Sequence, residues 1–169
     1  MAVEVAGAGS AYEAIEDLFR GSHASFLRTA YLLLNDRRAA EEAVQDAYVS
    51  VYRAYARGRV DSAEAYMRTA VVNACRSQIR TVVRRRRRSV AVVSASNSPE
   101  DAALLAEEHR EVIAALHRLP DRQRECLVLR YFLELSEADT AAALGISAGS
   151  VKTHVHRGIA ALTDALEDR

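Results

Sequence analysis

Apolar residues recur at intervals of three and four along most of the chain, which is the spacing that places them on one side of an α-helix. The first such stripe starts near Tyr12 and ends at Asn35. A second begins after Asp36, and a third runs from about Ala63 to Arg88. The pattern therefore predicts three helices in the first half of the chain, each able to bury one face.

The second half is separated from the first by residues 89–98, which carry neither charge nor a helical stripe. Helical patterning resumes at residues 98–101, where a serine cap, a proline and two carboxylates suit a helix start, and it stops at Pro120. Asp121 is predicted to cap the next helix, residues 122–135, which is apolar nearly all round and so central to a small bundle.

These patterns predict an all-α protein of two small helical domains. We expect an N-terminal domain over residues 11–88, a flexible linker over residues 89–98, and a C-terminal four-helix bundle over residues 99–169.

Residues 136–162 predict two helices joined by a tight turn. Ser136 can cap the first helix, with Asp139 as the reciprocal acceptor. Gly145 suits a left-handed turn position that other side chains resist. After the turn, helical spacing predicts one buried stripe, formed by Val151, Val155, Ile159 and Leu162.

The opposite face of this last helix carries small, hydrogen-bonding or cationic groups that can enter a major groove and meet phosphates. Its members are Gly149, Ser150, Thr153, His156 and Arg157, flanked by Lys152 and His154. The pattern favours a DNA-binding helix-turn-helix over the alternative, a plain helical hairpin with a polar surface.

The formal net charge is zero, but it is unevenly distributed. Residues 61–98 sum to +6, whereas residues 1–60 sum to −1 and residues 99–169 to −5. A basic middle between acidic parts indicates a local nucleic-acid contact in a protein that also docks on another protein. The run Arg84 to Arg88 fits salt-dependent attraction to phosphates, and a solvated helix end is the alternative.

Little points to catalysis, a metal or a membrane. Cys75 and Cys126 lie in apolar helical contexts and are predicted to be reduced core thiols. The histidine spacings match no common zinc pattern, and no Gly-rich phosphate loop or nucleophile elbow occurs, so we expect no metal, no cofactor and no enzymatic activity. No segment approaches the length of a membrane span, so we expect a cytoplasmic protein without membrane contact.

Three stretches in series resemble the extracytoplasmic-function (ECF) group of bacterial sigma factors, of the sigma-E-like type, which are promoter-recognition subunits of RNA polymerase. AEEAVQDAYVSVYRAY resembles the family's helix that grips the clamp helices of the polymerase largest subunit. AYMRTAVVNACRSQIR resembles its promoter-melting helix, and LPDRQRECLVLRYFLELSEADTAAALGISAGSVKTHVHRGIAAL resembles its upstream-element reader. The likeness covers about residues 12–166.

The resemblance implies roles for individual residues. It implies polymerase docking by Glu42, Gln45 and Asp46. It implies capture of the unwound minus-ten strand by the loop from Arg57 to Asp61, including Arg59, together with Asn73, Arg76 and Arg80. It implies reading of the duplex minus-thirty-five element by Ser150, Lys152, Thr153, His154, His156 and Arg157.

The chain departs from the family's common pattern at three positions. Tyr66 stands where the family often has tryptophan, Ser77 where it has aspartate, and His154 where it has arginine. A tyrosine still stacks on a base. The departures therefore predict a changed sequence preference.

The function implied is that of a sigma factor, which binds core RNA polymerase and directs it to a set of promoters. By the same analogy we expect a monomer when free, regulated from outside the chain by an anti-sigma factor, because no further segment follows Arg169. The alternative is a stand-alone helix-turn-helix regulator that binds duplex DNA as a dimer, since GISAGSVKTHV also resembles the DNA-binding domain of response-regulator-type activators.

Overall fold

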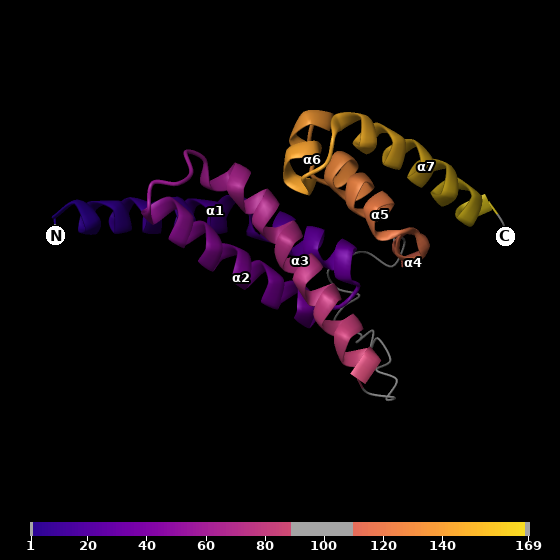
Figure 1. The fold of residues 1–169 in the computed structure, drawn as a ribbon, viewed down its shortest axis with the longest axis horizontal. Helices are drawn as coiled ribbons and strands as arrows, with labels where there is room; N and C mark the ends of the chain where they lie inside the picture. Colours follow the sequence, from indigo (N-terminus) through magenta and orange to yellow (C-terminus); the bar gives the residue numbers. More distant parts are fainter. Residues whose placement is uncertain (1, 89–109, 168–169) are drawn as a thin grey trace.

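The computed structural model describes the backbone of residues 2–88 and 110–167, and the side chains of residues 11–81 and 110–167. Within these ranges the regular structure is helical, which confirms the all-α class. The helices form an N-terminal and a C-terminal group (Figure 1). The predicted linker, residues 89–98, and the predicted helix start at residues 98–101 lie outside the described residues.

The N-terminal group consists of α1 (Ala2–Leu34), α2 (Arg37–Ala56) and α3 (Ala63–Arg88), packed side by side (Figure 1). The helix predicted from Tyr12 begins ten residues earlier, at Ala2. The amphipathic stripes meet in a shared core whose fully buried members include Val44, Val51, Met67, Val71 and Val72.

The turns of this group follow from local chemistry. Asp36 caps α2 by accepting a hydrogen bond from the Ala39 amide at 2.9 Å. After α2 the chain reverses at Gly58, whose φ of +62° is strained for other residues. The amides of Gly58 and Arg59 donate back to the carbonyls of Tyr55 and Ala54, which completes a Schellman motif.

The C-terminal group consists of α4 (Arg110–Arg118), α5 (Asp121–Leu127), a π-helical turn η3 (Val128–Phe132), α6 (Glu137–Leu144) and α7 (Ala148–Glu167). The helix predicted over residues 122–135 therefore divides. The π turn ends at Phe132. Two residues later Glu134 has a left-handed φ of +52°, and the Arg130 guanidinium donates to the Leu135 carbonyl beside it. Cys126 and Leu129 are fully buried, as expected of a central segment.

The predicted cap at Asp121 is wrong. Pro120 occupies the capping position and makes no side-chain cap, while Asp121 is the first helical residue. Its carboxylate instead accepts a 2.7 Å hydrogen bond from the buried Arg124, which also donates to the Leu119 carbonyl. The reason is that Pro120 has a fixed φ and lacks an amide hydrogen, so it suits the position that precedes a helix.

The helix-turn-helix forms as predicted. The Asp139 amide donates to Ser136 Oγ at 3.0 Å, and that hydroxyl donates to the Asp139 carboxylate. Gly145 has a φ of +64°, and a second Schellman motif closes there. Ser147 caps α7 by accepting from the Ser150 amide at 3.1 Å.

One residue of the predicted α7 stripe lies elsewhere. Val151 is fully buried, but Ile159 is 41% exposed, and Gly158 is buried in its place. A Cβ at Gly158 would lie 3.0 Å from Leu127 Cδ1. The missing side chain thus lets α7 approach α5 closely, which rotates Ile159 outward.

Both cysteines are free and buried, one in each helical group. Burial raises the pKa of the Cys75 thiol to about 12 and that of Cys126 to about 11, and the nearby Glu125 carboxylate adds to both. The expectation of buried core thiols is confirmed.

The close approach at Gly158 predicts the result of a substitution. Gly158→Val should lower the free energy of unfolding by about 1–3 kcal/mol, because the added carbons meet Leu127 and Gln123. Gly149→Val in the same helix is the control, since a Cβ there has only Ser147 Oγ nearby, at 3.9 Å. Chemical denaturation of both variants tests this, and an equal effect at the two glycines would contradict it.

His117 predicts a pH dependence. Burial, followed by the Arg124 charge, lowers its pKa from 6.5 to about 4, although the ring also bonds to the Leu32 backbone. The folded state thus holds His117 neutral, so its contribution is complete above pH 6.5 and is lost as pH falls towards 4. Allowing for partial solvent exposure, we expect a loss of about 1–2 kcal/mol.

The measurement is the free energy of unfolding across this pH range for wild type and for His117→Gln. The carboxylates titrate equally in both proteins, so only the histidine contribution should disappear in the variant. Parallel pH curves for the two proteins would refute the assignment.

Candidate nucleic-acid interface

The outer face of α2 carries the two acidic residues and the glutamine predicted to dock on polymerase. Glu42, Gln45 and Asp46 are all exposed and lie within about one helical turn. Glu42 pairs with Arg38 at 3.3 Å on the surface. Along the same face follow Val49, 47% exposed, and Tyr52, 39% exposed. Sequence reasoning missed these two, although their signal was available: both are apolar and fall outside the buried stripe.

A hollow of about 270 Å³ lies where α2 ends and α3 begins. Arg57 and Arg59 line it together with Tyr66, whose ring is 36% exposed. The other lining residues are Ser50, Arg53, Ala54 and Val60. An aromatic ring beside several guanidinium groups can stack on a base while holding its phosphates.

The remaining predicted strand-reading residues lie further along α3. Tyr66, Asn73 and Arg80 are seven residues apart and so share one exposed face of the helix. Arg76 lies three residues after Asn73 and four before Arg80, at the edge of this face. Its side chain is only 18% exposed and reaches the C-terminal group. The backbone of the arginine run ends α3, and its side chains lie outside the described residues.

Arg76 makes a bidentate ion pair with Glu125 of α5. Its Nε lies 2.7 Å from Oε1, and its Nη2 lies 2.8 Å from Oε2. Its Nη1 also donates to the Leu144 carbonyl at 3.4 Å. The hydrogen bonds from Arg76 to Glu125 raise the pKa of the Arg76 guanidinium, although burial opposes them. Arg76, which is predicted to bind DNA, thus forms hydrogen bonds within the protein instead.

The α7 helix presents most of its predicted duplex-reading residues together. Lys152, Thr153, His156 and Arg157 are exposed, and Ser150 is half-buried beside them. Two hydroxyls have local partners: Thr153 Oγ1 donates to the Gly149 carbonyl at 3.0 Å, and Ser150 pairs with Ser147 at 2.9 Å.

His154 differs from this set. It is half-buried and, at helical spacing, lies towards the packed side with Val151 and Gly158. The structure therefore brings five of the six predicted residues to the open face of α7, and His154 lies at its margin.

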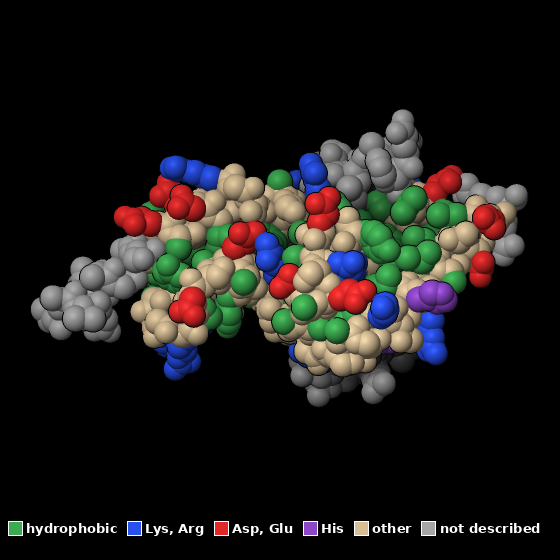
Figure 2. Space-filling view, turned by 90° about the horizontal axis from the view of Figure 1, so that it is seen from above, with side chains coloured by type: hydrophobic (Ala, Val, Ile, Leu, Met, Phe, Trp, Pro, Cys, Tyr) green, Lys and Arg blue, Asp and Glu red, His purple; other side chains and the backbone are tan. Residues whose placement is uncertain are grey.

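Charges of both signs are interspersed over the surface. Figure 2 shows acidic and basic side chains side by side on one face, with hydrophobic side chains gathered over the C-terminal helices at the right. Within the described ranges, no helix is long and apolar enough to cross a membrane. The described part of the chain also holds no group of three or more acidic, cysteine or histidine side chains that could bind a metal ion.

Comparison with known proteins finds family models that match both helical groups. The family model for Sigma-70 region 2 matches residues 18–88, which carry α2 and α3, and the model for Sigma-70, region 4 matches residues 109–162, which carry the helix-turn-helix.

Similar proteins align along most of the chain. The RNA polymerase sigma-E factor of Streptomyces avermitilis is 33% identical over 160 residues, which cover 91% of this chain and 86% of that protein. The ECF RNA polymerase sigma factor SigM of Mycobacterium tuberculosis is 34% identical over 160 residues, which cover 94% of this chain and 80% of that protein.

Solved structures with a similar fold also match most of the chain. The sigma factor RpoE of Bartonella quintana, solved in complex with the anti-sigma factor NepR, matches with a TM-score of 0.76 at 26% identity, over 91% of this chain and 97% of that chain. CnrH, solved with the cytosolic domain of CnrY, has the same fold, with a TM-score of 0.70 at 19% identity, over 98% of this chain and 96% of that chain. The chain therefore belongs to the extracytoplasmic-function group of RNA polymerase sigma factors.

Proposed function

We propose that this protein directs transcription initiation by core RNA polymerase at a specific set of promoters, through three separate surfaces. The observation that carries the proposal is that an acidic and apolar helix face, an aromatic and cationic hollow, and a helix-turn-helix lie on different elements of one chain. A stand-alone regulator needs only the last of these.

The α2 face is proposed as the polymerase-docking surface. Glu42, Gln45 and Asp46 supply charge and hydrogen bonds, while Val49 and Tyr52 supply apolar area beside them. An apolar centre with a polar rim is the usual composition of a protein interface. The acidic charge and the apolar area of this face would suit a partner surface on the polymerase that is helical or basic.

The hollow beside Tyr66 is proposed to hold an unpaired base of the minus-ten strand. Arg57 and Arg59 would hold the backbone at its rim, and Asn73 and Arg80 would follow the strand along α3. Single-stranded DNA is bound in this way, by aromatic stacking in a cationic groove.

The open face of α7 is proposed to read the minus-thirty-five element as duplex. Lys152 and Arg157 suit phosphate contacts, whereas Ser150, Thr153 and His156 suit base edges. Since His154 lies at the margin, we assign it a contact to the DNA backbone. Nothing favours dimeric binding over this monomeric arrangement.

The proposed function includes no chemical step of this chain's own, because the polymerase performs the chemistry in the cytoplasm. Because the Bartonella relative is solved with an anti-sigma factor, we also propose that an anti-sigma factor binds this protein and controls its access to polymerase.

Docking can be tested by co-purification with core RNA polymerase. The double variant Gln45→Ala, Asp46→Ala should bind about tenfold more weakly, because both side chains are lost from a rim that steers and orients the partner. Glu13→Ala, Asp17→Ala is the matched control, since it removes two exposed acidic side chains from α1. Unchanged binding by the first variant would remove the basis for this docking face.

Base capture can be tested with polymerase on a promoter that the protein recognises. Tyr66→Ala should reduce open-complex formation about 5- to 100-fold, which corresponds to the loss of one stacked base. Tyr66→Phe keeps the ring and should retain most of the activity. Tyr12→Ala, at an exposed tyrosine of α1, controls for loss of surface aromatic area. Equal activity of the alanine and phenylalanine variants at position 66 would exclude stacking.

A further inference from the structure

The Arg76–Glu125 pair joins the two helical groups across a distance of 49 residues in sequence. Arg76 comes from α3 and is one of the residues for which the family resemblance implies capture of the minus-ten strand. Glu125 comes from α5, in the domain that carries the helix-turn-helix. The pair is thus a contact between the two parts that bind DNA.

The geometry of this pair matches that of an arginine on a phosphate. A guanidinium binds a planar or tetrahedral oxyanion with two parallel hydrogen bonds, and both are present here at 2.7 and 2.8 Å. The third nitrogen is directed at the Leu144 carbonyl. The pair and the Leu144 contact use three of the five N–H donors of Arg76, and its side chain is only 18% exposed. In this arrangement the Nε–Nη2 edge of Arg76 is therefore occupied and cannot bind a DNA phosphate.

Glu125 is anchored in its own domain whether or not Arg76 is present. Its side chain is only 7% exposed, and Arg122, one turn earlier in the same domain, lies 3.3 Å from its Oε2. The Arg122 guanidinium also reaches the Leu144 carbonyl, at 3.4 Å. When the domains separate, Glu125 therefore keeps a counter-ion and Arg76 becomes free.

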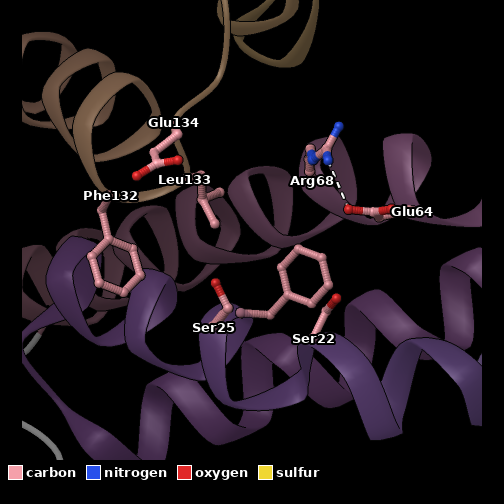
Figure 3. Close-up of a pocket in the computed structure, with 8 residues that line it drawn as sticks. Ser22, Ser25, Glu64, Arg68, Phe132, Leu133 and Glu134 are labelled. Carbon is pink, nitrogen blue, oxygen red and sulfur yellow. Dashed lines mark hydrogen bonds and ion pairs between the residues drawn. The ribbon is translucent and has the colours of Figure 1, made fainter.

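The rest of the contact between the groups is packed near α4, where His117 bonds to the Leu32 backbone of α1, and is hollow near the π-helical turn. The hollow has a volume of about 170 Å³. Figure 3 shows Phe132 and Leu133 of the C-terminal group on one side of it, with Ser22 and Ser25 of α1 on the other. The nearby Arg68 pairs with Glu64 on its own helix rather than across the interface.

We propose that Glu125 takes the place of a DNA phosphate on Arg76 in the free protein, and so holds the two domains in a closed form that binds the minus-ten strand weakly. This inference rests on the proposed function, since it assumes that Arg76 contacts DNA. Opening by the polymerase then releases Arg76 only when the protein is part of the initiation complex.

The test uses the full chain without polymerase. Binding of a short, fluorescein-labelled, random-sequence single-stranded DNA is measured by anisotropy, and domain separation by small-angle X-ray scattering. Glu125→Gln keeps the shape and removes the charge; we expect at least about fivefold tighter DNA binding and a larger radius of gyration. Glu64→Gln removes a carboxylate from an exposed arginine pair within α3 and should change neither quantity by more than about twofold.

Two further variants distinguish release of the ion pair from loss of the DNA contact and from loss of folding. Arg76→Ala should also enlarge the protein but should not gain DNA affinity, because the phosphate ligand itself is lost. If Glu125→Gln loses helical content by circular dichroism, the charge-exchanged variant Arg76→Glu, Glu125→Arg decides instead, with Arg122→Gln added to remove the like charge beside position 125. It should be as compact as wild type, whereas the single variant Arg76→Glu should be expanded.

Unchanged size and unchanged DNA affinity in Glu125→Gln would overturn the proposal, as would failure of the charge-exchanged pair to restore compactness. Both readouts are made without polymerase. They therefore decide this inference separately from the transcription experiments that test the proposed function.

Discussion

The C-terminal group depends on burial of the segment from Cys126 to Leu129 between its neighbours. The helices α4, α5 and α6 have nine, seven and eight residues, and helices this short do not persist alone in water. They form because they pack on their neighbours: α4 on α7, α5 on α7 and on the π-helical turn, and α6 on α7. The close contact at Gly158 then fixes α7 on α5, so the position of the open face of α7, which is proposed to read DNA, follows from packing on its opposite side.

The two domains are proposed to bind different forms of DNA, but the same kind of turn shapes both proposed sites. A Schellman turn at Gly58 shapes the rim of the Tyr66 hollow, and another at Gly145 sets the angle of the helix-turn-helix. In both places the turn leaves carbonyl groups at a helix end. At α6 the Leu144 carbonyl receives Arg76 and Arg122, so this helix end also contributes to the contact between the domains.

Periodicity predicted most of the helices and the all-α class, because each apolar stripe marks the face of its helix that is buried. Caps were predictable where a serine or aspartate precedes a free amide, as at Ser136, but not at Pro120, where backbone restriction decides. The π turn, the outward turn of Ile159 and the Arg76–Glu125 pair were not predictable, because they depend on contacts between distant segments. The candidate site residues came from resemblance and stay predictions. Val49 and Tyr52, which fall outside the predicted buried stripe of α2, are exposed in the structure and are proposed to join the docking face.

The two buried thiols have a consequence for the chemistry of the chain. Only the thiolate is nucleophilic, and the raised pKa values of Cys75 and Cys126 keep both protonated at neutral pH. Oxidants and alkylating reagents therefore act on them only after the surrounding core has opened. Since each helical group contains one of these cysteines, the modification rate of each thiol measures how often its own domain opens.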